Sequence, residues 1–135
     1  MVQANVAIVD QARNGTGCAI VHSDSEIGIQ HLNQEASKAL SAGLKAGYKI
    51  SKARAMKWIT SNPAKAAGIY EETGSLQVGK NADVVLWSQN PFSVYALAEK
   101  VYIDGAIAFD KEKGLVPNSD FDLGILNPTK NRIQE

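Results

Sequence analysis

The hydrophobic pattern divides the chain into a first half with helical periodicity and a second half with the alternation of β-strands. In the first half, apolar residues recur at helical spacing over residues 2–13, 29–46 and 51–61, and each stretch predicts a helix. Ser51 is the expected N-cap of the third helix. A short fourth helix is expected over residues 64–67, after an Asn-Pro pair that stops the third.

A short apolar run over residues 17–21 interrupts the helical pattern and predicts a buried strand of a parallel sheet. Cys18 lies in this run and is expected to be a small buried hydrophobe. His22, Ser23 and Asp24 follow at the C-terminal end of the predicted strand, where α/β proteins hold their reactive groups. A helix that leads into a parallel strand is half of an α/β repeat, so this part of the chain is assigned to the α/β class.

The second half of the chain predicts strands joined by turns. Residues 83–87 are rich in β-formers, and so are residues 100–103 and 106–109. Asp104-Gly105 separates the last two runs, and this dipeptide suits a two-residue hairpin turn with positive φ. Beyond Lys111 the sequence is polar, and this tail is expected to be extended and partly ordered. The predicted fold class is therefore α/β plus β.

Composition indicates one globular domain and excludes several function classes. The 14 basic and 14 acidic residues cancel, which argues against a nucleic-acid-binding surface. The single cysteine excludes a disulfide framework, and no apolar run approaches the ~20 residues of a membrane span. No signal peptide is visible, so a cytoplasmic location is expected. The basic residues around the joint between the second and third predicted helices are expected to form a solvated face rather than a DNA-binding surface: Lys45, Lys49, Lys52, Arg54 and Lys57.

Asp24 is the first candidate for chemistry. A carboxylate at the end of a buried strand can bind a metal ion or act as a general base, although it can also cap a turn. His22 would share its side of the strand and could reach the same metal, or could simply bond within the loop. His31 is expected to be solvated or to cap a helix. Ser23 and Ser25 have no base at a recognisable spacing, which disfavours a nucleophilic serine.

Four stretches together resemble the metal-dependent amidohydrolase superfamily, in its imidazolonepropionase-like and prolidase-like branch. Residues 19–25, Ala-Ile-Val-His-Ser-Asp-Ser, resemble the last barrel strand of those enzymes. Residues 58–69 resemble the helix that leads away from the barrel, and residues 73–87 resemble the return into a small β-sandwich. Residues 100–109 resemble its closing hairpin. The resemblance covers nearly the whole chain in order.

This resemblance implies a fold and a reaction. Relatives are (β/α)8 barrels with a β-sandwich, and they hold one or two divalent metals, often zinc, at the barrel mouth. Residues 1–68 would be the end of the barrel, and residues 69–135 would be a β-sandwich portion with its tail. Asp24 would bind metal and shuttle the proton of the attacking water. The implied substrates are small molecules with amide, cyclic amide or dipeptide-like carbon–nitrogen bonds.

The sequence lacks the other metal ligands of these relatives, which are a His-x-His pair on the first strand, a lysine or carboxylate on a middle strand and histidines on two later strands. Catalytic metal sites use at least three protein ligands, so Asp24 alone is not sufficient. We therefore expect a C-terminal amidohydrolase fragment that binds no metal and is inactive on its own. It would form homo-oligomers or require the missing N-terminal part of the barrel. The alternative is a non-catalytic α+β module that binds itself or a partner.

Overall fold

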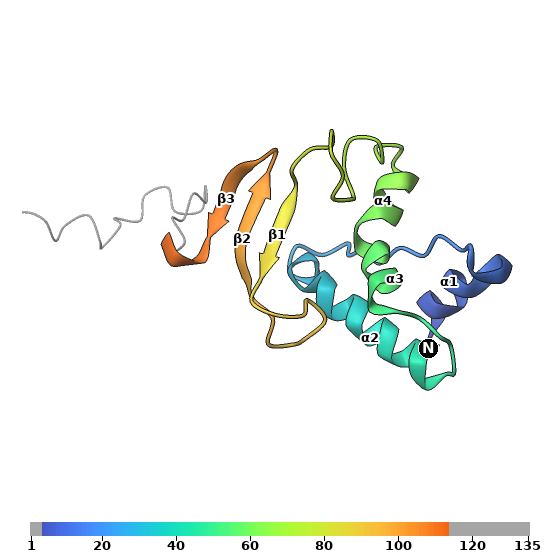
Figure 1. Cartoon of the computed structure of the whole chain (residues 1–135). Helices are drawn as coiled ribbons and strands as arrows, with labels where there is room; N and C mark the ends of the chain where they lie inside the picture. The colour runs from blue at the N-terminus through green and yellow to red at the C-terminus, as the bar shows by residue number, and fades with distance from the viewer. Residues whose placement is uncertain (1–3, 114–135) are drawn as a thin grey trace, which may run out of the picture.

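The computed structural model describes residues 4–113 of the 135-residue chain. Helices lie on one side of the molecule and a three-stranded sheet lies on the other (Figure 1). The predicted tail beyond Lys111 falls almost entirely outside the described residues. The elements in chain order are α1 (Asn5–Gly15), η1 (Gly28–His31), α2 (Leu32–Lys45), α3 (Lys52–Met56), η2 (Lys57–Ile59), α4 (Ser61–Ala66), β1 (Val84–Trp87), β2 (Ala98–Ile103), β3 (Ala106–Asp110) and η3 (Lys111–Lys113).

The predicted helices form, but three of them are interrupted. The helix expected over residues 2–13 corresponds to α1, whose backbone is non-helical at Ala12, Arg13 and Asn14. The expected helix over residues 29–46 begins as the 3-10 turn η1 before it continues as α2. The expected helix over residues 51–61 is divided into α3 and η2, and its N-cap is confirmed, because Ser51 Oγ accepts the backbone N–H of Arg54 at 3.1 Å. The fourth helix begins earlier than expected, at Ser61, and places Pro63 in its first turn, where the missing N–H is not needed.

The strand predicted over residues 17–21 is absent from the described structure, and the prediction of a parallel sheet is wrong for this part of the chain. A strand requires hydrogen bonds to a neighbouring strand, and none of the described strands lies beside this segment. Cys18 is exposed, contrary to the expectation of burial. Ala19, the next residue, is buried in the helical core, so the helices cover only one side of the segment.

The core lies among the helices and is built around Trp58, which is completely buried. Small residues allow the helices to approach closely. A Cβ atom on Gly43 of α2 would lie 2.6 Å from the Cβ of Ala7 on α1. The buried apolar residues of this cluster are Ala7, Ala19, Ala36, Leu40, Ile50, Ala55, Trp58 and Phe92.

The sheet has the antiparallel order β1-β2-β3, and the predicted hairpin between β2 and β3 is confirmed. Asp104 and Gly105 both have positive φ, at 50° and 78°, as a two-residue hairpin turn requires. The segment between β1 and β2 ties the sheet to the helices, because Asn33 Nδ2 on α2 donates to the Pro91 carbonyl at 2.7 Å. Large apolar side chains stay exposed on the strands: Val85, Leu86, Ile103 and Ile107.

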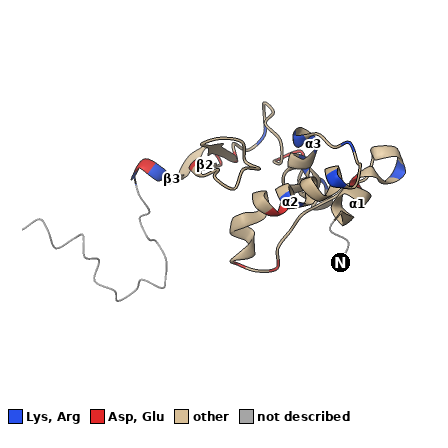
Figure 2. Ribbon diagram, turned by 90° about the horizontal axis from the view of Figure 1, so that it is seen from below, with Lys and Arg blue, Asp and Glu red and all other residues tan. Residues whose placement is uncertain are grey.

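Charged residues are dispersed over the described structure. Figure 2 shows Lys and Arg at several separate places along the ribbon, with Asp and Glu between them. Lys45, Lys49, Lys52 and Lys57 are exposed, as predicted for a solvated face. Arg54 is the exception, because its guanidinium turns inward to an ion pair with Asp10.

Candidate functional site

Asp24 lies in the loop between the extended segment of residues 18–22 and η1, with 94% of its side chain exposed. His22 is close to it, as its spacing predicted, with 3.4 Å between His22 Nδ1 and Asp24 Oδ1. The His22 side chain is also largely exposed, at 74%, so water screens this contact. The structure therefore brings the two candidate residues together at the surface.

The two serines that flank Asp24 hold its backbone in place. Ser23 Oγ accepts the N–H of Ser25 and donates to the Ser25 carbonyl, both at 3.1 Å. Ser25 Oγ in turn accepts the N–H groups of Ile27 and Gly28 at 3.2 Å each. We call these contacts of Ser23 and Ser25 the serine clasp. They order the turn that carries Asp24, whose carboxylate is exposed to solvent.

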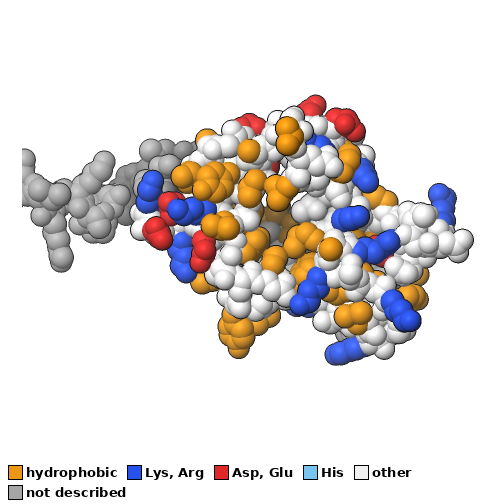
Figure 3. All heavy atoms as spheres, in the orientation of Figure 1, with side chains coloured by type: hydrophobic (Ala, Val, Ile, Leu, Met, Phe, Trp, Pro, Cys, Tyr) orange, Lys and Arg blue, Asp and Glu red, His pale blue; other side chains and the backbone are white. Residues whose placement is uncertain are grey.

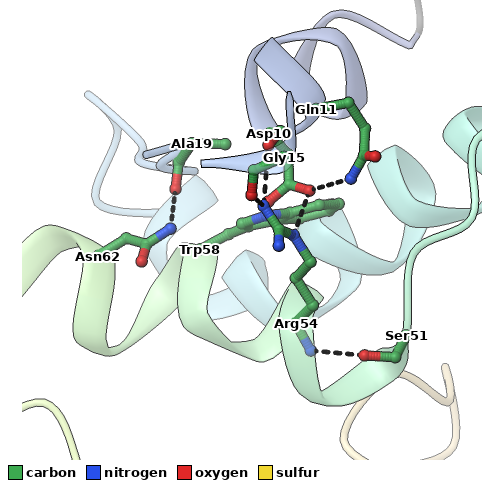
Figure 4. Close-up of polar contacts among 8 residues, drawn as sticks. All are labelled: Asp10, Gln11, Gly15, Ala19, Ser51, Arg54, Trp58 and Asn62. Atoms are coloured by element: carbon green, nitrogen blue, oxygen red, sulfur yellow. Dashed lines mark hydrogen bonds and ion pairs between the residues drawn. The ribbon is translucent and has the colours of Figure 1, made fainter. Parts of the chain in front are cut away.

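The segment that leads to Asp24 is anchored on the helices after α2. The Val21 N–H donates to the Trp58 carbonyl at 3.0 Å. Asn62 Nδ2, from the first turn of α4, donates to the Ala19 carbonyl at 2.8 Å in a buried position (Figure 4). These bonds satisfy backbone groups that a neighbouring strand would otherwise pair.

Trp58 is fixed by a buried polar network with Asp10 at its centre. Asp10 Oδ1 accepts the indole N–H of Trp58 at 2.8 Å. Asp10 Oδ2 accepts Arg54 Nε at 2.5 Å and Gln11 Nε2 at 2.8 Å. Arg54 Nη2 also donates to the carbonyls of Asp10 and Gly15 (Figure 4). The network connects α1 to α3 and η2.

The ionised form of Asp10 is favoured in this network. Burial acts to raise the pKa of its carboxyl, but the hydrogen bonds from Arg54, Trp58 and Gln11 and the charge of Arg54 together lower that pKa below its ordinary value. A buried carboxylate with this set of donors is a structural anchor between helices.

Local sequence patterns do not indicate that Asp10, Arg54, Trp58 and Asn62 hold this segment. Asp10 lies within a helical pattern, where a charged residue indicates a solvated position. Asn62 was interpreted only as a helix stop. The one usable signal was the presence of Trp58 in the third predicted helix, because a tryptophan that becomes buried needs an acceptor for its indole N–H.

The described residues supply few side chains that could bind the expected metal ion. Within residues 4–113, no group of three or more His, Cys, Asp or Glu side chains is arranged to hold a metal ion. His22 and Asp24 supply two donors, and His31 is exposed on η1. Since a catalytic metal needs at least three protein ligands, the described residues alone do not fit such a site.

A separate apolar groove of about 960 Å³ lies between α3, α4 and β1. Figure 3 shows hydrophobic side chains around this hollow, between the sheet and the helices. Neither Asp24 nor His22 lines it, so the groove is not part of the candidate site. Its apolar lining includes Met56, Ile59, Ala64, Leu76, Val84 and Trp87.

None of the helices described here is long and apolar enough to cross a membrane.

Comparison with known proteins gives a consistent result. Residues 7–117 match the sequence model of the amidohydrolase family. The chain is 32% identical over 90 residues to amidohydrolase tasK of Hapsidospora irregularis, which covers 67% of this chain and 9% of that protein. It is 46% identical over 55 residues to the urease alpha subunit of Haloquadratum walsbyi, which covers 41% of this chain and again 9% of the relative.

The solved structure of an amidohydrolase from Thermotoga maritima is also similar to this chain. The TM-score is 0.66 at 29% sequence identity, and the match covers 80% of this chain and 26% of the other. The chain thus spans about a tenth of the two curated relatives and about a quarter of the solved one.

Proposed function

Because this chain belongs to the amidohydrolase family, we propose that it is the C-terminal part of a larger metal-dependent amidohydrolase. The small share of each relative that it spans supports this proposal. The complete enzyme would hydrolyse carbon–nitrogen bonds of small molecules with amide, cyclic amide or dipeptide-like groups. The chain on its own would be inactive.

In this proposal Asp24 is the catalytic residue that the chain contributes. The observation that carries it is the setting of the carboxylate, which is exposed while the serine clasp fixes the backbone on both sides. A carboxylate in such a place can take a proton from an attacking water and return it to the leaving nitrogen. His22, 3.4 Å away, would line the same site.

The proposed metal of the complete enzyme is a divalent ion, with zinc as the first candidate. Such an ion lowers the pKa of water in hydrolases of this kind. Asp24 would be one of its ligands, and the remaining ligands would come from outside this chain, because the described residues do not complete a site.

The proposed architecture assigns residues 1–68 to the end of a (β/α)8 barrel and residues 69–135 to a β-sandwich portion. Residues 17–21 form no helix in the described chain and would become the last barrel strand when neighbouring strands are present. The exposed apolar residues of the sheet support the second assignment, since a sandwich would cover them. In the isolated chain a second copy would cover them instead, which gives a homo-oligomer.

The exposed apolar residues also favour the alternative function, a self-associating or partner-binding module. The experiment that separates the two functions is Asp24→Asn in the complete protein. The matched control is Asp104→Asn, which changes another exposed aspartate and leaves an Asn-Gly hairpin turn. The proposed function predicts that only Asp24→Asn abolishes amide hydrolysis. Unchanged turnover in Asp24→Asn would contradict it.

A further inference from the structure

We propose that Asn62 is the positioning residue for Asp24, because its side-chain amide fixes the extended segment that carries Asp24 to the site. This inference rests on the proposed function, in which Asp24 is catalytic. Asn62 itself does not reach the carboxylate, and its effect passes through the backbone of residues 19–23.

Residues 19–23 are held by the helices that follow α2. Two hydrogen bonds with these helices fix their backbone, one from Asn62 Nδ2 to the Ala19 carbonyl and one from the Val21 N–H to the Trp58 carbonyl. The Asn62 bond is made by a side chain and is buried, so a single substitution can remove it. The Trp58 bond is made between backbone atoms, so a substitution of the Trp58 side chain does not remove either bonded group.

Asn62 itself is well fixed. It lies in the first turn of α4 directly before Pro63, and only 9% of it is exposed. Cys18 Sγ lies 3.9 Å from the backbone carbonyl of Asn62, so Asn62 contacts the segment at two neighbouring residues, Cys18 and Ala19. Ala19, whose carbonyl accepts the bond, belongs to the buried core.

A short path along the backbone leads from Ala19 to Asp24. Only Ile20 to Ser23 separate the two residues, and the serine clasp makes the last part of this path rigid. The Asp24 side chain has no described protein contact other than exposed His22. The place of its carboxylate is therefore set by the backbone, and a shift at Ala19 is carried to the site.

Asn33 provides a matched control. It is also buried, at 8% exposure, and its Nδ2 also donates to a backbone carbonyl, that of Pro91, at 2.7 Å. That bond ties α2 to the segment before β2, and it is not made to residues 19–24. Asn62→Asp and Asn33→Asp thus make the same chemical change, in which a carboxylate replaces a buried donor and faces a carbonyl.

The test compares Asn62→Asp, Asn33→Asp and Asp24→Asn in the complete enzyme, with Asn62→Ala as a second variant that adds no charge. Each variant is checked for a cooperative melt. We expect Asn62→Asp and Asn62→Ala to lower kcat by about 10- to 100-fold with little change in KM, because catalysis is sensitive to displacements near 1 Å. Hydrogen exchange should become faster over residues 19–24 in both. Asn33→Asp should change neither kcat nor the rate of hydrogen exchange over residues 19–24.

The outcomes distinguish the inference from the function on which it rests. If Asp24→Asn abolishes turnover while the Asn62 variants resemble Asn33→Asp in kcat and in exchange, the positioning role is wrong and the proposed function stands. If Asp24→Asn retains turnover, the proposed function is wrong and the positioning role falls with it. A loss of kcat confined to the Asn62 and Asp24 variants supports both.

Discussion

Trp58 donates its indole N–H to Asp10 Oδ1 at 2.8 Å, and both side chains are almost completely buried. This bond joins α1 to η2 through two residues that are 48 positions apart in the chain. It also supports the candidate site, because the Trp58 carbonyl accepts the N–H of Val21, three residues before Asp24. The stability of the helical part and the placement of the site thus depend on the same buried residues.

The first prediction concerns this bond. Trp58→Phe should lower the free energy of unfolding by about 1–3 kcal/mol, because Asp10 Oδ1 loses its donor in a buried place. Urea denaturation measures the change. Trp87→Phe is the control, since Trp87 is only partly buried and lies on β1. Equal losses in the two variants would show that the Asp10 bond adds nothing.

The second prediction is a pH dependence due to Asp10. Its pKa in the folded chain is lowered from the ordinary value of 3.8, so its contribution to stability is complete above that value and is lost as pH falls through the folded pKa. Asp10→Asn cannot titrate. The difference in unfolding free energy between the original chain and Asp10→Asn should therefore be largest near neutral pH and shrink below pH 3.8. A difference independent of pH would contradict this origin.

The periodicity of the sequence predicted the helices and the hairpin, because local spacing and the Asp-Gly turn determine those elements. It could not predict the state of residues 17–21, since a strand depends on partners that are not among the described residues. The buried role of Asp10 was missed for a related reason. Its partners Arg54 and Trp58 are distant in sequence, and only the packed helices bring them to one place.

The proximity of His22 to Asp24 could be predicted from local spacing, whereas the contacts that hold the segment before Asp24 could not. The tether from Asn62 to Ala19 spans 43 residues. Nothing in the local pattern around Asn62 distinguishes a tether from a helix stop.

The third prediction concerns Asp83, which lies directly before β1 and bonds both the turn between β2 and β3 and the loop that contains Thr73. Its Oδ1 accepts the Asp104 N–H at 3.1 Å and its Oδ2 accepts the Thr73 hydroxyl at 2.8 Å. These bonds lower the pKa of the Asp83 carboxyl, that from Asp104 most. Asp83→Ala should speed hydrogen exchange at the Asp104 amide. Thr73→Val leaves the Asp104 bond in place and should not change exchange at that amide. Equal acceleration in both variants would refute a direct bond between the Asp104 N–H and Asp83.

The fourth prediction concerns the close contact of α1 and α2. Gly43→Ala gains ~1 kcal/mol of helix propensity but places a Cβ at 2.6 Å from the Cβ of Ala7. Overpacking costs about 1–3 kcal/mol, so the net effect should be a loss of about 1 kcal/mol in thermal or urea unfolding. The double variant with Ala7→Gly should be more stable than the sum of the single changes predicts. Simple additivity would contradict the contact.

We propose above all that this chain supplies Asp24 to an amidohydrolase site that other residues complete. The most direct test of this proposal measures divalent metal content and amide hydrolysis on the same samples, for the 135-residue chain alone and for the complete protein. We expect the complete protein to bind metal and to turn over the amide, and we expect Asp24→Asn to abolish both. The chain alone should show neither metal binding nor turnover. Stoichiometric metal and turnover in the isolated chain would contradict the proposal.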